Sequence, residues 1–344
     1  MNVHMKIKAW KKLSLLVIAM GFSCVATAQQ EPQFTEYMFN RMSYNPGYAG
    51  SSGSICATAM YRNQWMGLTL DKPYADAKET GSTPTDILFT FDMPVQFLHG
   101  GWGLTFVSDK IGFHDNVEVD LDYAFRMFWG SGNLSAGAEV NLLNSTLDYT
   151  YLRGPNDLSG DPSNPVSSSG DPLLQGQSAS AFMFDVSVGA YYQVPGKYYL
   201  GFSVKNLLGS HSDEIHFSNA RTVYAMGGYD YTPSSAPSIR IRPSFLLKTA
   251  NFSIFQADVS CLVDYRNAVW GGLSYRVQDA FSVLAGVHWW KLRVGVAYDF
   301  TTSRLGTFKS NRSNGSLELY LRFCFKVVIP RKPATSYGNT IYLL

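Results

Sequence analysis

Alternation of apolar and polar residues, with a period of two, recurs along most of this 344-residue chain. In the segment NVEVDLDYAFRM, Val117, Leu121 and Phe125 belong to the apolar set, whereas Glu118 and Asp122 belong to the polar set. The segments KLRVGVAYDF and SLELYLRFCFK alternate in the same way. Because successive side chains of a β-strand point to opposite faces, this pattern predicts strands with one apolar face and one charged face.

Runs of this kind mark fourteen candidate strands. They lie near residues 54–62, 84–93, 101–108, 115–128, 132–146, 181–193, 197–205, 219–230, 239–248, 252–264, 267–276, 281–288, 290–300 and 315–326. The connections after the first, third, fifth, seventh and thirteenth strands are long or polar, and most of the others are short turns. An even number of strands with short turns at one end and long loops at the other is typical of an outer-membrane β-barrel.

We therefore predict an all-β fold, a transmembrane outer-membrane β-barrel of about fourteen antiparallel strands. No run after residue 28 reaches the roughly 18 apolar residues of a membrane-spanning helix. A closed barrel satisfies every backbone hydrogen bond within lipid. Aromatic residues make up 15% of the chain and gather at the predicted strand ends, as in the interfacial girdles of such barrels. The alternative is a soluble sandwich or propeller, whose strands also alternate.

The chain begins with the features of an export signal. Four lysines precede the apolar run from Leu13 to Phe22, and small residues end at Ala28, after which cleavage is expected. The predicted organisation is a signal peptide at 1–28, an N-terminal aromatic periplasmic or plug segment at 29–53, a barrel at 54–326 and a C-terminal tail at 327–344.

The stretch QFTEYMFNRMSYNPGYAGSSG, residues 33–53, is aromatic and nearly uncharged, and Asn45, Pro46 and Gly47 interrupt it. Burial of a large apolar side chain is worth roughly 1.5–3 kcal/mol, so these aromatic residues are expected to leave water. We expect the stretch to fold into or across the periplasmic mouth of the barrel, to plug the lumen and to present a docking surface. The alternative is local packing that only guides closure of the barrel.

The charged faces of the predicted strands point into the lumen, and their charges nearly cancel. The inward positions are Asp86, Asp92, Glu118, Asp120, Asp122, Glu139, Asp185, Asp258, Asp264, Asp299 and Glu318 against Arg62, Arg126, Arg240, Arg242, Lys248, Lys291, Arg293, Arg322 and Lys326. An ion-selective porin presents one dominant sign at its constriction. Near balance instead favours a lumen that is cross-linked by ion pairs or filled by a plug. Pro243, within a predicted strand, lacks a hydrogen-bond donor and predicts a bulge there.

The cysteines indicate neither a disulfide framework nor a metal site. After signal cleavage three remain, Cys56, Cys261 and Cys324, an odd number at wide spacing. We interpret them as ordinary small side chains within strands.

Motifs for catalysis and ligand binding are equally sparse. His211 and His216 lack the helical spacing of a zinc pair, and the aspartates of the 147–180 loop lack the regular spacing of a calcium loop. No phosphate loop or nucleophile motif is present. We predict that the protein is not an enzyme and uses no cofactor and no metal.

Several blocks of the sequence resemble one known family. In order, they are EPQFTEYMFNRMSYNPGYAGSSG, TAMYRNQWMGL, SDKIG, LDYAFRM, RPSFLLK, GGLSYR and DFTTSRLGTFKSNRSNGSLELYLRF. From about Glu31 to Lys326 the chain resembles the PorP/SprF family of type IX secretion system membrane proteins from Bacteroidota. It departs from the family at Arg41, where proline is more usual, in the 147–180 insert and in the tail after Lys326.

The resemblance implies an outer-membrane barrel that assists export or surface anchoring of a specific large adhesin with a C-terminal sorting domain, in some members for gliding motility. It also implies as partners the cargo, other type IX components and a periplasmic peptidoglycan-binding lipoprotein. The chain carries 28 basic and 26 acidic residues, so no basic surplus favours nucleic acid. Two alternative functions are a diffusion channel for small solutes and a structural tether to a periplasmic peptidoglycan-binding partner.

Partner-binding residues are expected in two places, on the basis of the family motif and of position at the ends of elements. One set comprises Arg62, Asn63, Gln64 and Trp65 at the outer end of the first strand, and the other comprises Tyr37, Phe39, Asn45, Pro46 and Tyr48 in the opening stretch. Interfacial anchoring alone would account for Trp65.

Overall fold

The computed structural model describes residues 31–67, 83–112, 114–147, 178–213, 215, 217–303 and 313–326. The expected signal peptide, most of the 147–180 loop, His216 and the C-terminal tail lie outside these residues, and so do the predictions made for them. Within the described ranges, no helix is long and apolar enough to cross a bilayer.

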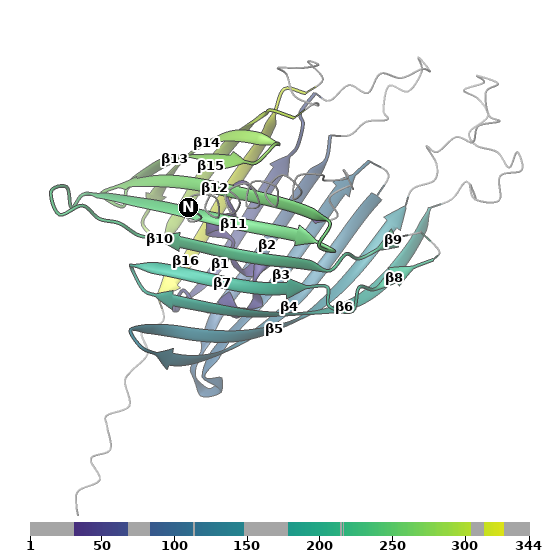
Figure 1. Cartoon of the computed structure of the whole chain (residues 1–344), viewed down its shortest axis with the longest axis horizontal. Coiled ribbons are helices and arrows are strands. Elements are labelled where there is room, and N and C mark those ends of the chain that lie inside the picture. The colour runs from purple at the N-terminus through teal and green to yellow at the C-terminus, as the bar shows by residue number, and fades with distance from the viewer. Residues whose placement is uncertain are drawn as a thin grey trace, which may run out of the picture.

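Fourteen antiparallel strands form a closed barrel in which each strand pairs with its neighbours along the chain (Figure 1). The strands are β1 (Ser54–Asn63), β2 (Thr85–Val95), β3 (Gly100–Ile111), β4 (His114–Trp129), β5 (Gly132–Leu147), β6 (Ala179–Val194), β7 (Tyr198–Lys205), β10 (Thr222–Tyr229), β11 (Ile239–Ala250), β12 (Ile254–Tyr265), β13 (Val269–Arg276), β14 (Ala280–Trp289), β15 (Leu292–Thr301) and β16 (Ser316–Lys326). A separate hairpin joins β8 (His211–Ser212) to β9 (Phe217–Ser218) in the connection between β7 and β10. The predicted barrel and its strand number are confirmed.

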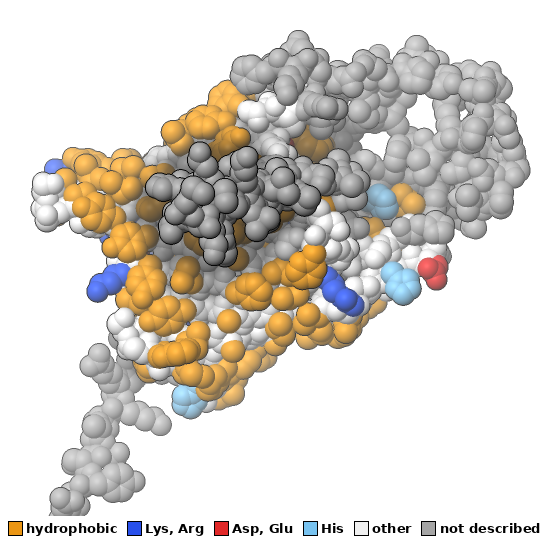
Figure 2. Space-filling view, viewed as in Figure 1, with side chains coloured by type: hydrophobic (Ala, Val, Ile, Leu, Met, Phe, Trp, Pro, Cys, Tyr) orange, Lys and Arg blue, Asp and Glu red, His pale blue; other side chains and the backbone are white. Residues whose placement is uncertain are grey.

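The outer wall of the barrel is apolar, as the period of two requires. Outward-facing residues such as Phe89, Leu121, Val259 and Leu319 are exposed, whereas their neighbours along each strand are buried. Figure 2 shows mostly hydrophobic side chains over the strands of this face, with the few visible charged side chains toward the edges. Such a belt is suited to contact with lipid.

The barrel closes where β1 pairs with β16, and a disulfide joins Cys56 to Cys324 across this seam. The two residues are direct cross-strand partners with their Cα atoms 4.2 Å apart. The prediction that these cysteines are unpaired was wrong, because 268 residues separate them in sequence and only closure of the barrel makes them neighbours. Cys261 is a free cysteine and is exposed.

The bulge predicted at Pro243 is also absent. The pairing of β11 with β12 continues in one register through Pro243, which lies opposite Cys261. On its other side the ladder to β10 stops at Ser244, and one bridge between Tyr231 and Ile241 resumes it in the same register. The missing donor is therefore accommodated by a gap in the ladder at this position rather than by an extra residue.

The connections divide between the two ends of the barrel. We call the end that carries the β1–β2, β5–β6, β7–β10 and β15–β16 connections the loop end, and the opposite end the turn end. In outer-membrane barrels the short turns face the periplasm and the long loops face the exterior. β1 begins at the turn end, so residues 31–53, which we call the plug segment, join the barrel wall there.

Candidate functional site

The plug segment lies inside the barrel. It forms three short 3-10 helices, η1 (Tyr37–Phe39), η2 (Met42–Tyr44) and η3 (Pro46–Tyr48), and nearly all of its residues from Gln33 to Ser51 are buried. η3 contacts β4, β5, β6 and β7 of the wall. The centre of the barrel is therefore filled by the chain itself.

Aromatic contacts join the plug segment to the wall. The ring of Phe39 stacks on Tyr320 at 4.7 Å between centroids and lies 4.8 Å from Trp270. Tyr48 makes an edge contact with Tyr191 at 5.4 Å. Each such pair contributes roughly 0.5–1.5 kcal/mol beyond the burial of its area.

Arg41 belongs to the same packing. Its guanidinium carbon lies 3.7 Å above the ring centroid of Tyr199, and its Nη1 donates to the hydroxyl of Tyr191 at 3.0 Å. Its Nε donates to the Met38 carbonyl at 3.0 Å. The cation–π contact with Tyr199 and the hydrogen bond to Tyr191 fix the plug segment to β7 and β6.

A buried charged network holds the first part of the plug segment near the loop end. The backbone N–H groups of Thr35 and Glu36 donate to the two carboxylate oxygens of Glu318 at 2.7 and 2.8 Å. The Thr35 hydroxyl lies 2.8 Å from an oxygen of Asp299. Two barrel carboxylates therefore bind the plug backbone and its hydroxyl directly.

Two arginines compensate these carboxylates. Arg62, only 1% exposed, pairs with Asp299 at 2.8 Å and with Glu318 at 2.9 Å, and it also donates to the Thr35 hydroxyl. Arg276 pairs with Asp258 at 3.0 Å and lies 3.7 Å from Asp299. Buried charges are tolerated when they are paired and hydrogen-bonded, and loss of one partner is costly.

Glu36 is a buried exception in this network. It is 0% exposed, and neither of its carboxylate oxygens has a hydrogen-bond partner among the described residues. Burial raises the pKa of Glu36 well above its usual value, and the nearby carboxylates of Glu318 and Asp299 raise it further. The neutral acid is therefore the form that suits this position.

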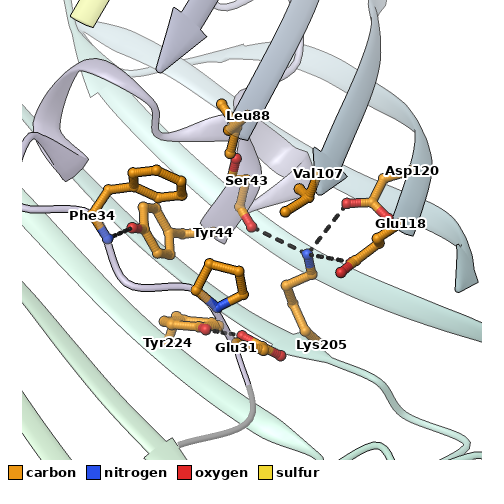
Figure 3. A pocket seen from close by; sticks show the side chains of 11 residues that line it. Glu31, Phe34, Ser43, Tyr44, Leu88, Val107, Glu118, Asp120, Lys205 and Tyr224 are labelled. Carbon is orange, nitrogen blue, oxygen red and sulfur yellow. Dashed lines mark hydrogen bonds and ion pairs between the residues drawn. The ribbon is translucent and has the colours of Figure 1, made fainter. Parts of the chain in front are cut away.

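A second charged group surrounds Lys205 of β7. Its ammonium lies 3.4 Å from Asp120, 3.4 Å from Glu139 and 3.7 Å from Glu118. It also donates to the Ser43 carbonyl of the plug segment at 3.2 Å. Figure 3 shows this lysine between η2 and the acidic side chains of β4.

A small cavity of about 30 Å³ lies beside Lys205, with room for one or two water-sized groups. Glu31 lies on its wall, where its carboxylate accepts hydrogen bonds from the Tyr224 hydroxyl and from Asn206. In Figure 3 the phenol of Tyr44 points to the backbone N–H of Phe34, which donates to it. The cavity is too small for a substrate and is part of the packing around the plug segment.

Glycines of the wall form a bed under the middle of the plug segment. At each of them a Cβ atom would lie under 3.0 Å from plug atoms. The members of this glycine bed are Gly101, Gly103, Gly137, Gly189, Gly201 and Gly295. Gly137 and Gly189 are direct cross-strand partners beneath Asn45, Pro46 and Gly47. A strand glycine often marks a close approach of another backbone, and here that backbone is the plug segment.

Asn45 ties this contact together. Its Nδ2 donates to the carbonyls of Ala190 and Phe202 at 3.0 and 3.3 Å, and its Oδ1 accepts from the Gly47 N–H at 2.8 Å. The asparagine thereby caps η3 and binds the edges of β6 and β7 together.

Arginines fix the last part of the plug segment near the turn end. Arg126 donates to the carbonyls of Gly50 and Ala49 at 3.1 and 2.9 Å. Arg322 donates to the Phe39 carbonyl at 3.1 Å and to the Tyr48 hydroxyl at 3.3 Å. The plug segment is thus held by carboxylates toward one end of the lumen and by guanidinium groups toward the other.

The two predicted sets of partner-binding residues are placed as follows. Tyr37, Phe39, Asn45, Pro46 and Tyr48 are buried inside the barrel, and so is Arg62. Asn63, Gln64 and Trp65 are partly exposed at the loop end. Arg62 binds Thr35 of the plug segment, a residue that neither set includes. Their role in binding a partner stays a prediction, and for the buried residues it would require the plug segment to leave the lumen.

Sequence reasoning missed several residues of this interface. Lys205 and Arg276 lie at the inward parity of predicted strands, and that parity was sufficient to identify them. Thr35 and Glu36 carried no signal, because their partners come from the far end of the chain. Among the described ranges, no group of three or more His, Cys, Asp and Glu side chains is arranged to hold a metal ion.

Comparison with known proteins identifies a family. The model of the family described as type IX secretion system membrane protein PorP/SprF matches residues 26–323. No curated protein matches the chain.

Three of the solved structures that are similar to the chain illustrate the likeness. Omp33 of Acinetobacter baumannii has 7% identity and a TM-score of 0.43, over 79% of this chain and 97% of that one. The CymD monoaromatic hydrocarbon channel has 9% identity and a TM-score of 0.47, over 83% and 92%. A Pseudomonas aeruginosa FadL homologue has 11% identity and a TM-score of 0.41, over 85% and 94%. These values are too low for any property of those proteins to be carried over.

Proposed function

The chain belongs to the PorP/SprF family of type IX secretion system membrane proteins and is a β-barrel of the outer membrane, and from this we propose a role in export. In this proposal it assists the export or surface anchoring of a specific large adhesin that carries a C-terminal sorting domain. The match of the family model over residues 26–323 carries the proposal.

The filled lumen supports a particular form of this role. The plug segment occupies the barrel and is bound by charged groups toward both ends, so in the described part of the chain it stands in the way of a polypeptide. We propose that the barrel acts beside the path of the cargo, as an anchor or partner, and does not conduct the cargo itself. The same observation disfavours the diffusion channel for small solutes.

The partners in this proposal are the cargo, other type IX components and a periplasmic peptidoglycan-binding lipoprotein. Gliding motility would follow if the cargo were an adhesin that moves cells over surfaces. The tether alternative predicts that a periplasmic protein copurifies but that no cargo is lost when the barrel is absent.

The test compares cell-surface and culture-supernatant proteins between the parent strain and a strain that lacks this gene. We expect one or a few sorting-domain proteins to disappear from the surface and to return when the intact gene is restored. An unchanged surface proteome would contradict the proposal. Outer-membrane levels of an unrelated barrel, measured in the same samples, control for general damage to the envelope.

A further inference from the structure

Charges inside the barrel are separated along its axis. From the middle of the lumen to the loop end, acidic side chains outnumber basic ones. The acidic ones are Asp86, Asp109, Glu118, Asp120, Asp122, Glu139, Asp185, Asp258, Asp299 and Glu318, and the basic ones are Arg62, Lys205, Lys248 and Arg276. Toward the turn end the balance reverses. The basic side chains there are Arg126, Arg240, Arg242, Arg293, Arg322 and Lys326, and the acidic ones are Asp92, Asp230 and Asp264. Acidic and basic side chains are therefore nearly equal in number over the whole lumen, but basic side chains are in excess at the turn end.

Three basic residues form a row across neighbouring strands at this end. His288 of β14 lies directly opposite Arg293 of β15, and Arg293 lies directly opposite Arg322 of β16. Cross-strand partners share a face, and Arg322 reaches the plug segment, so the row faces the lumen. Arg293 and Arg322 are like charges directly opposite each other, and such a pair destabilises a sheet. With strands about 4.8 Å apart, the row spans roughly 10 Å.

Two acidic groups nearby, Asp264 and Asp230, both act on Arg242. Asp264 already lies 2.6 Å from Arg242 and 3.9 Å from the imidazole of His288. Arg322 is engaged by the plug segment. Arg293 is exposed, makes no hydrogen bond or ion pair with the described part of the chain, and lies close enough to Arg242 to repel it.

One buried donor in this region also lacks an acceptor. The Nη2 atom of Arg242 is buried and has no hydrogen-bond partner among the described residues. A buried guanidinium nitrogen without an acceptor is costly, and this guanidinium, which lies 5.6 Å from the ring centroid of Phe39, is not fully satisfied by the described chain. Repulsion along the row and this free donor both favour an anionic ligand.

We propose that the turn-end vestibule binds an acidic segment of a periplasmic protein through several Asp or Glu carboxylates. The vestibule is the lumen-facing set Arg240, Arg242, His288, Arg293 and Lys326. Lipid headgroups surround the outside of a barrel, whereas these side chains face its interior. Their spread over several strands matches a run of carboxylates better than a single small anion. The inference goes beyond the export role and holds whether or not that role is correct.

The test measures binding of a fluorescent hexaglutamate peptide to the purified full-length barrel in detergent, with hexaglutamine as the neutral probe. We expect hexaglutamate alone to bind, with affinity that falls as salt rises. R293Q should weaken binding roughly two- to fivefold, and R240Q/R293Q should weaken it further. K110Q is the matched control, because Lys110 is an exposed lysine at the loop end and should leave binding unchanged.

R293Q is expected to fold, because Arg293 is exposed and unpaired within the described ranges, and removal of the repulsion should raise the thermal midpoint. Equal affinities of the wild type, R293Q and R240Q/R293Q would overturn the proposal. Displacement of the peptide by inorganic phosphate at an equal concentration would also overturn it, because the site would then bind single anions. Vesicles that contain phosphatidylglycerol should not compete, and competition by them would assign the basic residues to lipid. Failure of either lipid or peptide to bind leaves the export test above unaffected.

Discussion

Filling the glycine bed should open the barrel to ions. In the Gly137→Val/Gly189→Val variant, even the Cβ atoms would lie under 3.0 Å from the plug segment, where ordinary contact begins at 3.4 Å. The nearest plug atoms, of Asn45 and Gly47, would lie 2.1 and 2.3 Å from these Cβ atoms, so restoring ordinary contact requires the plug segment to move by about 1 Å, and the γ-methyl groups require more. A shift of this size takes both Asn45 hydrogen bonds, now 3.0 Å to Ala190 and 3.3 Å to Phe202, beyond the limit of a hydrogen bond.

The cost of this movement can be set against what holds the plug segment. Overpacking costs about 1–3 kcal/mol at each site, and each neutral hydrogen bond contributes about 0.5–1.5 kcal/mol. Because the two sites are adjacent, we expect a combined loss of roughly 3–6 kcal/mol in plug binding. The strands themselves should persist, because valine has a high preference for β-structure.

The assay is single-channel conductance of the purified barrel in planar bilayers. The wild type should be nearly silent, G189V should open occasionally and G137V/G189V should conduct for long periods. The matched control is G271V, another strand glycine, where a Cβ would meet nothing closer than 3.5 Å. A folded double variant that stays as silent as the wild type would refute the reasoning, and so would a wild type that conducts freely.

Three further predictions concern stability. The Cys56→Ser/Cys324→Ser variant should unfold at a lower denaturant concentration than the wild type, because a cross-link over 268 residues removes about 5–6 kcal/mol of chain entropy from the unfolded state. C261S, which changes a free cysteine, is the control. Equal unfolding midpoints of the double variant and the wild type would contradict the prediction. Arg62→Gln should lower the free energy of unfolding by about 3–5 kcal/mol, because Asp299 and Glu318 lose a buried partner; a thermal midpoint within error of the wild type would exclude this. Glu36 binds its proton more tightly in the folded protein, so its stabilising contribution should be complete below pH 4.5 and should decline as pH rises toward the raised pKa. In E36Q the urea midpoint of unfolding should therefore depend less on pH between pH 5 and pH 8 than in the wild type. An equal pH dependence in the two proteins would contradict the prediction.

The strands were predictable because their signal is local. The alternation around Val117 and Leu121 reports which side chains face lipid, and it needs no knowledge of any distant residue. The lengths of the connections predicted that the strands close into a barrel, with short turns at one end and long loops at the other. For the same reason Lys205 and Arg276 were within reach of the sequence, since the parity of their strands alone points them inward.

Other features depend on which strands become neighbours. Cys56 and Cys324 seemed unrelated until β1 paired with β16, and Pro243 required a bulge only while its ladder with β10 was assumed to be continuous. The carboxylates that bind Thr35 come from β15 and β16, more than 250 residues away in the chain. No periodic pattern reports such distances.

The sequence by itself determined the barrel, its apolar wall and the near balance of charge within the lumen, because each follows from the alternation of side chains along single strands. Only the tertiary structure decided that the aromatic opening stretch fills the lumen, which glycines support it, and that acidic and basic groups separate along the axis. Those features arise from the register and the closure of fourteen strands, which bring together side chains that no local pattern connects.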